Sequence, residues 1–244
     1  MTHILLFGAS GGIGGGVLLE ILDRYPSVTL IVPHRSTSDI PSVPLGPHQT
    51  LVPIPWDPDQ PDRLAADLAP HAEARFDLCL CAIGGLHHNG MMPEKKLGHI
   101  TMEQLTWAYQ TNAIVPSMII KHVAPLMAKT IPSILGIFSA RVGSIGDNRL
   151  GGWYAYRAAK AALNMMIKTA AIEMKRFNPN VSIVGIHPGT VDTPLSEPFQ
   201  THVPKENLFT PRQSASYIFD NIINQVSPSD SGHVFAWDGE RIPE

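Results

Sequence analysis

A cluster of glycines near the N-terminus constrains the fold of this chain more than any other feature. The apolar run 3–7 leads into Gly8-Ala9-Ser10-Gly11-Gly12-Ile13-Gly14, and apolar residues then recur at helical spacing as far as Leu22. Glycine allows a tight turn from a strand into a helix, and it lets an anion approach the free N–H groups of the first helical turn. This order predicts the first unit of a dinucleotide-binding α/β domain, although a plain tight turn is the alternative for the cluster taken by itself.

Strand and helix patterns alternate along the rest of the chain. Apolar and β-branched runs predict strands at 28–32, 51–54, 77–83, 134–138, 181–186 and 233–236. Helices are predicted at 62–68, from Thr101 towards Met127, over 154–177 and from Thr210, where Thr-x-x-Gln and Pro211 resemble a capped helix start. Alternation from end to end predicts a single-domain, doubly wound Rossmann fold over residues 1–244, with a mostly parallel sheet flanked by helices.

Two segments depart from this alternation. Residues 36–50 are rich in proline, which removes N–H donors, so an irregular crossover is expected in place of a helix. Residues 194–209 are also irregular and carry apolar side chains such as Leu195 and Phe199. We expect this segment to form a mobile lid over a substrate.

Composition excludes several classes of function. The formal net charge is −3 and the 18 Lys and Arg residues form no basic stripe, so no nucleic-acid partner is expected. No apolar run is long enough to predict a membrane span. The two cysteines, Cys79 and Cys81, share one face of a predicted strand and are interpreted as buried thiols in a reducing, cytoplasmic setting. No metal site is predicted, because the His87-His88 pair has no partner at ligand spacing.

The end of the second predicted strand indicates the cofactor. An acidic residue there would hold the ribose 2′-hydroxyl of NAD, but the chain has Pro33-His34-Arg35-Ser36. Arg35 could clamp a 2′-phosphate through its planar fork, so NADP(H) is predicted as the preferred cofactor and NAD(H) as the alternative. A solvated surface residue is the other interpretation of Arg35. Asp57 is a candidate acceptor for the adenine amino group or, equally, a turn residue before Pro58.

A tyrosine and a lysine stand four residues apart on the predicted helix 154–177. Tyr156 and Lys160 would therefore share one helical face. A phenol is a weak acid at neutral pH, and a nearby ammonium stabilises its ionised form. We predict that Tyr156 transfers a proton to a carbonyl oxygen with the help of Lys160.

These motifs together resemble the short-chain dehydrogenase/reductase family, over nearly the whole chain. The Gly8-x-x-x-Gly12-x-Gly14 turn matches the family's cofactor turn, and Tyr156-x-x-x-Lys160 matches its catalytic pair. The segment 151–157 is similar to the subgroup of C-factor-type proteins and sniffer-type carbonyl reductases. The resemblance implies catalytic support from Asn112, through a proton-relay water, and cofactor contacts by Ala82, Ile83, Gly84, Pro188, Gly189, Val191 and Thr193.

One position departs from the family pattern. The family has a catalytic serine after the fifth strand, three residues before a glycine, and counting back from Gly143 places Ala140 there. Ser139 is one residue earlier, on the opposite face of a strand, and Ser144 lies in the following loop. Either hydroxyl is a candidate substitute.

Three hypotheses follow, of which the first is an NADP(H)-dependent oxidoreductase that interconverts a carbonyl and an alcohol. The second is a weakly catalytic dinucleotide-binding sensor, which Ala140 motivates, and the third is a structural protein without cofactor. The partner expected is a small-molecule carbonyl or alcohol. Pairing through the helices at 101–127 and 154–177 would give a homodimer or homotetramer, with Met118, Met165 and Met166 in an interface or in the core.

Overall fold

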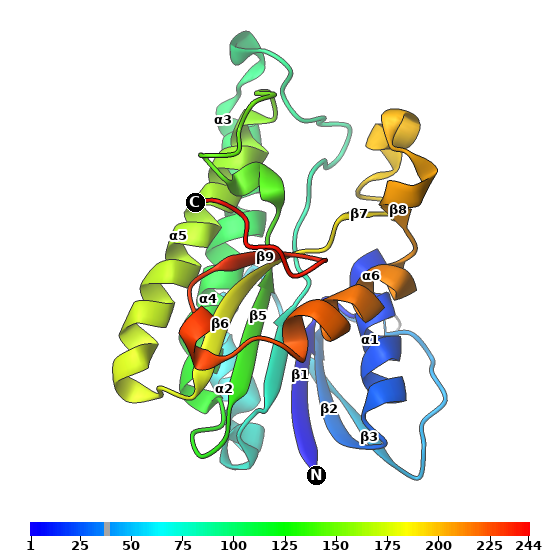
Figure 1. Cartoon of the computed structure of the whole chain (residues 1–244), viewed down its shortest axis with the longest axis vertical. Helices are drawn as coiled ribbons and strands as arrows, with labels where there is room; N and C mark the ends of the chain where they lie inside the picture. Colours follow the sequence, from blue (N-terminus) through cyan, green and yellow to red (C-terminus); the bar gives the residue numbers. More distant parts are fainter. Residues whose placement is uncertain (37–39) are drawn as a thin grey trace.

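A seven-stranded parallel sheet forms the centre of the computed structural model, which describes residues 1–36 and 40–244 (Figure 1). The strand order within this described part is β3-β2-β1-β4-β5-β6-β9, and every neighbouring pair is parallel. The strands are β1 (Thr2–Phe7), β2 (Ser27–His34), β3 (His48–Pro55), β4 (Leu78–Cys81), β5 (Ser133–Phe138), β6 (Val181–His187) and β9 (Val234–Ala236). This arrangement confirms the predicted doubly wound α/β fold.

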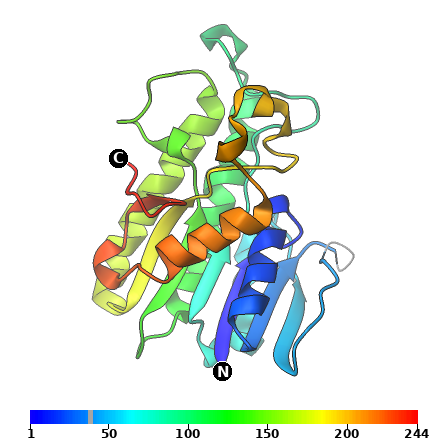
Figure 2. The same cartoon turned by 45° about the vertical axis from the view of Figure 1, so that its right-hand side comes forward.

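Helices cover both faces of the sheet. The helices α1 (Gly12–Arg24) and α6 (Pro211–Ile218) lie side by side on one face. The other face carries α2 (Leu64–Leu68), α4 (Val115–Val123) and α5 (Tyr154–Phe177), as Figures 1 and 2 show from two directions. The helix α3 (Met102–Tyr109) packs along α5, where the small side chains Ala108, Ala155 and Ala159 permit a close approach. Within residues 1–36 and 40–244, no helix is long and apolar enough to cross a membrane.

Short turns complete the described chain. The 3-10 turns are η2 (Pro61–Arg63), η3 (Ala69–Ala74), η4 (Leu97–His99), η6 (Ala124–Leu126), η7 (Arg141–Gly143), η8 (Glu197–His202), η9 (Lys205–Asn207) and η11 (Pro228–Asp230). Two π-helical turns are η5 (Gln110–Ile114) and η10 (Phe219–Ile223).

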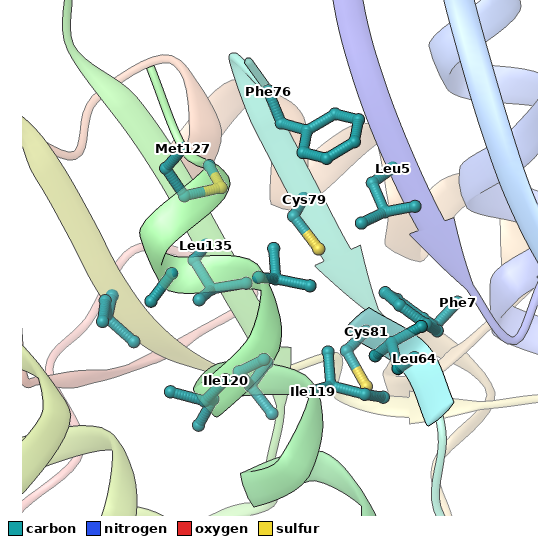
Figure 3. Close-up of a cluster of buried hydrophobic side chains, with 14 of the residues drawn as sticks. Leu5, Phe7, Leu64, Phe76, Cys79, Cys81, Ile119, Ile120, Met127 and Leu135 are labelled. Atoms are coloured by element: carbon teal, nitrogen blue, oxygen red, sulfur yellow. The ribbon is translucent and has the colours of Figure 1, made fainter. Parts of the chain in front are cut away.

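Alternation along the strands divides the core between the two faces. In β1, Leu5 and Phe7 face the α4 and α5 side, whereas Ile4 and Leu6 face α1 and α6. Figure 3 shows that Cys79 and Cys81 join the first of these clusters. Both thiols are free, and burial raises their pKa, to about 11 for Cys81. The predicted shared face of the two cysteines is thereby confirmed.

Close packing of α1 against α6 explains one glycine for which the sequence offers no reason. A Cβ on Gly16 would lie 2.4 Å from the carbonyl oxygen of Pro211, at the start of α6. A Cβ on Gly15 would be 3.6 Å from the nearest atom, the carbonyl oxygen of Ala9. Gly16 therefore permits the contact between the two helices, whereas Gly15 does not have this role.

The crossover from β2 to β3 contains no helix in its described residues, 35–36 and 40–47, as the prolines predict; residues 37–39 lie outside the described part. Ile40 and Val43 pack against the α1 side of the core. The strand β3 is longer than the predicted 51–54 and includes Pro53. It lies at the edge of the sheet, where the missing N–H group of a proline breaks no ladder bond.

The helix predicted from Thr101 towards Met127 is confirmed as one unbroken helical run over residues 102–126, in which the hydrogen-bonding pattern changes from α3 through the π-turn η5 to α4 and the 3-10 turn η6. Pro116, in the first turn of α4, cannot donate to the carbonyl of Asn112, so the α-helical ladder is interrupted there. The capping box at Thr101 is half formed. The Thr101 hydroxyl accepts from the N–H of Gln104 (3.1 Å), but the Gln104 side chain donates to the carbonyl of Met92 (2.7 Å).

The segment 194–209 is held at its base by two short parallel strands, β7 (Thr190–Val191) and β8 (Leu208–Phe209). Behind it, α6 begins with a complete capping box, since the N–H of Gln213 donates to the Thr210 hydroxyl and the N–H of Thr210 donates to the Gln213 side chain. The helix start predicted at Thr210 is confirmed.

Candidate active site

A cleft of about 500 Å³ opens at the edge of the sheet where the parallel strands end. This is the edge at which open α/β sheets bind ligands. Its lining comes from residues following β4, β5 and β6, from the first turns of α5 and from the segment 194–209, whose backbone lies in the upper half of Figure 1. Among the described residues that line it are Ile13, Ala82, Ile83, Gly84, Leu86, Ala140, Arg141, Asp147, Arg149, Leu150, Trp153, Tyr156, Arg157, Lys160, His187, Pro188, Gly189, Val191, Leu195, Phe199 and Val203.

The glycine-rich turn stands beside this cleft with the start of α1 uncapped. No side chain bonds the first N–H groups of the helix, and the first turn holds no acidic residue. Ser10, Gly11 and Gly12 are exposed. A Cβ on Gly14 would lie 1.9 Å from the carbonyl oxygen of Gly8, so the turn requires glycine there. An open, uncapped helix start of this kind suits the pyrophosphate of a dinucleotide.

Thr193 and Gly12 bring the base of the segment 194–209 against the glycine-rich turn. A Cβ on Gly12 would lie 2.4 Å from the methyl group of Thr193. On the other side of the turn, a Cβ on Gly8 would be 3.0 Å from the carbonyl group of Ala82 after β4. The predicted cofactor residues of three separate segments therefore meet in one place.

Asn112 lies in η5 and is completely buried. Its side-chain nitrogen donates to the carbonyls of Gly85 (2.8 Å) and Ala108 (3.0 Å), and its oxygen accepts from the N–H of Gly85 (3.0 Å). These bonds fix the backbone that follows Gly84 at the cleft. π-helical turns such as η5 occur frequently at functional sites.

Tyr156 and Lys160 project from α5 into the cleft, and the Lys160 ammonium lies 5.8 Å from the centre of the Tyr156 ring. Lys160 is 3% exposed and donates to the carbonyl of Phe138 (2.9 Å). Burial lowers the pKa of Lys160 to about 8 and raises the pKa of Tyr156. The Tyr156 phenol is therefore protonated over the neutral range, which differs from the expected lowering of its pKa by Lys160.

Ala140 lines the cleft at the position where the family has its serine, and both nearby hydroxyls are engaged elsewhere. Ser139 faces α5, and its hydroxyl donates to the side-chain oxygen of Asn164 (2.6 Å). The Ser144 hydroxyl donates to the carbonyl of Pro243 and accepts from the N–H of Asp147 (3.0 Å). Ser139 lines the cleft, whereas Ser144 is not among its lining residues.

Arg35 and Asp57 lie outside the cleft and are exposed, just beyond the ends of β2 and β3. The Asp57 carboxylate accepts from the N–H of Asp59 (2.9 Å) and from the Gln60 side chain (3.1 Å). These are the bonds of a local turn, one of the two interpretations of Asp57.

Glu94 is a residue that the sequence does not single out. It is 2% exposed, and its carboxylate accepts from the N–H of Ala155 (3.2 Å), one residue before Tyr156. Its backbone carbonyl accepts from the N–H of Trp153 (2.6 Å), while its second carboxylate oxygen is buried without a partner. Since α5 has no cap from its own N-terminal residue, Glu94 supplies one from 61 residues away. No local pattern in the sequence predicts that contact.

His187 and Arg141 are two further cleft residues. Burial, together with the neighbouring charge of Arg141, lowers the pKa of His187 to about 4, so its ring is neutral at physiological pH. Arg141 forms ion pairs with Asp147 (3.2 Å) and Glu240 (3.0 Å). His187 is the last residue of β6.

Aromatic contacts hold the segment 194–209 over the cleft. The Phe199 ring packs edge-on against Trp153, with 5.0 Å between ring centres. A ring nitrogen of His87 lies 3.0 Å from the carbonyl oxygen of Pro194. His88 stacks on Trp107 instead. Among the described residues, no group of three His, Cys, Asp or Glu side chains is arranged to hold a metal ion.

A seven-stranded parallel sheet with a glycine-rich turn and a cleft at its carboxyl edge defines a Rossmann-type α/β protein. The family model described as short chain dehydrogenase matches residues 2–204, and the chain belongs to this family. Its resemblance to C-factor-type and sniffer-type proteins is also supported by the matches below.

Two curated relatives illustrate the sequence similarity. The 1-hydroxy-2-glutathionyl-2-methyl-3-butene dehydrogenase of Rhodococcus sp. (strain AD45) is 34% identical over 154 residues, 63% of this chain and 64% of the relative. The C-signal protein of Myxococcus xanthus is 27% identical over 147 residues, 60% of this chain and 82% of the relative. The chain spans about half to two thirds of the length of the first curated relatives it matches.

Solved structures share the whole fold. The carbonyl reductase Sniffer of D. melanogaster superimposes with a TM-score of 0.78 at 22% identity, over 100% of both chains. An NADPH-bound carbonyl reductase from chicken fatty liver gives a TM-score of 0.78 at 21% identity, over 100% of this chain and 99% of the other. At these identities the similarity establishes the fold.

Proposed function

We propose that this protein is an NADP(H)-dependent oxidoreductase that interconverts a carbonyl and an alcohol, with Tyr156 as the proton donor. The observation that carries the proposal is the convergence of Tyr156, Lys160 and the glycine-rich turn at one cleft. Membership of the short chain dehydrogenase family and the NADPH-bound structural neighbour support it.

The chain's own residues suit the cofactor. The uncapped start of α1 at Gly12 would take the pyrophosphate, and Ala82–Gly84 would contact the adjoining ribose. Pro188, Gly189, Val191 and Thr193 would hold the nicotinamide end, as the family resemblance implies. Arg35 would take a 2′-phosphate through its guanidinium fork, which favours NADP(H) over NAD(H).

When bound, the nicotinamide supplies a hydride to the substrate carbon or receives one from it. Tyr156 keeps its proton at neutral pH, because burial raises the pKa of the phenol. It therefore serves as the acid that protonates the carbonyl oxygen during reduction. The Lys160 ammonium, next to the Tyr156 ring, stabilises negative charge as that proton leaves. Asn112 keeps the backbone at Gly85 in place beneath this pair.

The missing serine favours a second candidate function, a dinucleotide-binding sensor with weak catalysis. Ala140 offers no hydrogen bond to a carbonyl oxygen, and the hydroxyls of Ser139 and Ser144 already have partners. Loss of one such donor typically lowers the rate by about 10²–10³. Turnover that depends on Tyr156 would argue against the sensor.

The experiment is a fluorescence titration of the wild-type protein with NADPH and with NADH, followed by assays on aldehydes and ketones. We expect NADPH to bind more tightly, Arg35→Ala to remove that preference, and Arg176→Ala, at the exposed C-terminal end of α5, to keep it. Tyr156→Phe should bind NADPH normally and lose turnover. Binding without turnover on any carbonyl would support the sensor, and absence of saturable binding would refute both functions.

Three further features are part of this proposal. Residues 194–209 would act as a lid that moves during substrate entry. On α5, the exposed fractions are 65% for Met165, 45% for Met166 and 56% for Ile172, so these side chains do not belong to the core. Exposed apolar side chains of this kind suit the interface of a homodimer or homotetramer. The unbridged thiols of Cys79 and Cys81 are consistent with a reducing, cytoplasmic location. Light scattering on the purified protein tests the assembly.

A further inference from the structure

The substrate part of the cleft carries guanidinium groups that lack an acidic partner. We propose that the substrate is an amphipathic carbonyl compound or alcohol with a carboxylate or other anionic group, bound by Arg149 and Arg157. This inference rests on the proposed function, because it describes the substrate of the same cleft.

Arg157 follows Tyr156 directly and lines the cleft. Its Nε donates to the carbonyls of Gly151 (3.2 Å) and Gly152 (3.0 Å), and one terminal nitrogen donates to the carbonyl of Val142 (3.3 Å). No acidic group among the described residues pairs with it, and burial lowers its pKa. A guanidinium has five N–H donors, so donors remain for a ligand.

Arg149 lies in the loop between η7 and α5 and also lines the cleft. It is exposed, and within the described part of the chain it forms neither an ion pair nor a hydrogen bond. A side chain with no partner can turn towards a ligand without first breaking a contact.

The only acidic side chain among the described lining residues is Asp147, and it already forms an ion pair. Asp147 pairs with Arg141, which is held from its other side by Glu240. This trio carries a net charge of −1, but both of its carboxylates bond the Arg141 guanidinium, and neither forms an ion pair with Arg149 or Arg157. An anionic group bound by these two arginines would supply the missing charge and could accept two parallel N–H bonds from a guanidinium.

Apolar side chains form the rest of the substrate wall. They come from the segment after β4, from the loop before α5 and from the segment 194–209, and include Leu86, Leu150, Trp153, Leu195, Phe199 and Val203. A lining of this kind binds an apolar body, while a few polar groups orient it. The combination indicates a substrate with an apolar body and one anionic end, rather than a sugar or a small neutral ketone.

Matched aldehydes test the proposal with NADPH as reductant. The probes are 4-formylbenzoate and the longer 4-formylphenoxyacetate, each compared with its neutral methyl ester. We expect kcat/KM to be about tenfold or more higher for each acid, since hydrogen bonds to charged groups are among the strong ones. The preference should reside in KM and fall with added salt, because charge attraction is screened.

Variants assign the preference to the two arginines. Arg149→Gln, which breaks no contact among the described residues, should lower kcat/KM for the acids more than for the esters. Arg157→Lys keeps the charge and should retain part of the preference. Arg176→Gln, at the exposed end of α5, is the matched control and should behave like the wild type. Equal kcat/KM for acids and esters, or a preference that Arg149→Gln and Arg157→Lys leave intact, would overturn the proposal.

Direct binding separates this inference from the proposed function. Calorimetry compares 4-(hydroxymethyl)benzoate with its methyl ester in the wild type and in Arg149→Gln, and it needs no turnover. Tighter binding of the acid that depends on Arg149, without turnover of any aldehyde, would retain the anion site and reject the reductase. Turnover of acids and esters alike, with no binding preference, would retain the reductase and reject the anion site.

Discussion

Replacement of Lys160 by methionine should make the cofactor-free protein more stable while weakening its function. The Lys160 ammonium is 3% exposed and has no acidic partner within the described residues; its hydrogen-bond acceptor is the carbonyl of Phe138. Burial lowers its pKa from the ordinary 10.5 to about 8. At about 1.4 kcal/mol for each pH unit of that difference, the folded state carries the charge at a cost of about 3 kcal/mol at pH 7.

Methionine fills a similar volume without charge but loses the hydrogen bond to Phe138, which is worth about 2 kcal/mol because its donor is charged. The free energy of unfolding of Lys160→Met should therefore exceed that of the wild type by about 1 kcal/mol. For a domain of this size, such a difference raises Tm by about 2–4 °C. Urea unfolding at pH 7, followed by circular dichroism, measures it.

The pH dependence of this difference is the sharper test. Below pH 8 both the folded and the unfolded wild type carry the ammonium, so the penalty is complete. Between pH 8 and 10.5 the folded state loses its proton first, the unfolded state binds more protons, and wild-type stability rises with pH relative to the variant. The advantage of Lys160→Met should shrink over this interval.

A matched lysine on the same helix supplies the control. Lys175→Met, in the exposed last turn of α5, should change stability by less than about 0.5 kcal/mol at every pH. A Lys160→Met variant no more stable than the wild type at pH 7, or a difference that stays constant from pH 7 to 10.5, would refute the reasoning that burial of this charge is costly.

Three other changes have defined outcomes. Ala140→Ser restores a donor at the cleft and should raise kcat about tenfold or more, but a rise that survives in a Tyr156→Phe background would contradict this account. Gly16→Ala should destabilise the protein by about 1–3 kcal/mol, because its Cβ would lie 2.4 Å from the carbonyl oxygen of Pro211. Gly15→Ala should instead stabilise it by about 0.5–1 kcal/mol, because alanine favours a helix and has room there. Thermal unfolding of the two variants shows whether the two effects have opposite signs. Glu94→Ala removes the cap on α5 and should cost about 1 kcal/mol, with faster amide exchange at Ala155; equal exchange in Glu94→Ala and Glu94→Gln would contradict the capping role.

Much of the fold was predictable, because short-range patterns determine it. The helix 154–177 was predicted with the bounds that the structure has, since a long periodic run of helix-forming residues ends at Asn178 and Pro179. The capping box at Thr210 depends on residues three apart and was also correct. The long middle helix was also correct, but its π-turn η5 was not predicted, because the apolar period continues through Pro116 although the α-helical hydrogen bonding cannot.

The candidate site divides in the same way. The glycine-rich turn and the pair Tyr156 and Lys160 are local motifs, and the sequence identified them. The sequence also indicated that Ala140 replaces a serine. It did not show that the Ser144 hydroxyl donates a hydrogen bond to the carbonyl of Pro243, 99 residues away, or that the Ser139 hydroxyl donates one to the side chain of Asn164.

The sequence by itself therefore determined the order of strands and helices, the strand-to-helix turn at Gly8–Gly14 and the spacing of Tyr156 and Lys160, because each depends on neighbours along the chain. The tertiary structure decided which side chains share the cleft and which already have partners. Glu94 caps α5 from 61 residues away, and Arg141 meets Glu240 across 99 residues. Such contacts form only when the parallel strands bring their carboxyl ends together at one edge of the sheet. The burial that shifts the pKa values of Lys160 and His187 has the same origin.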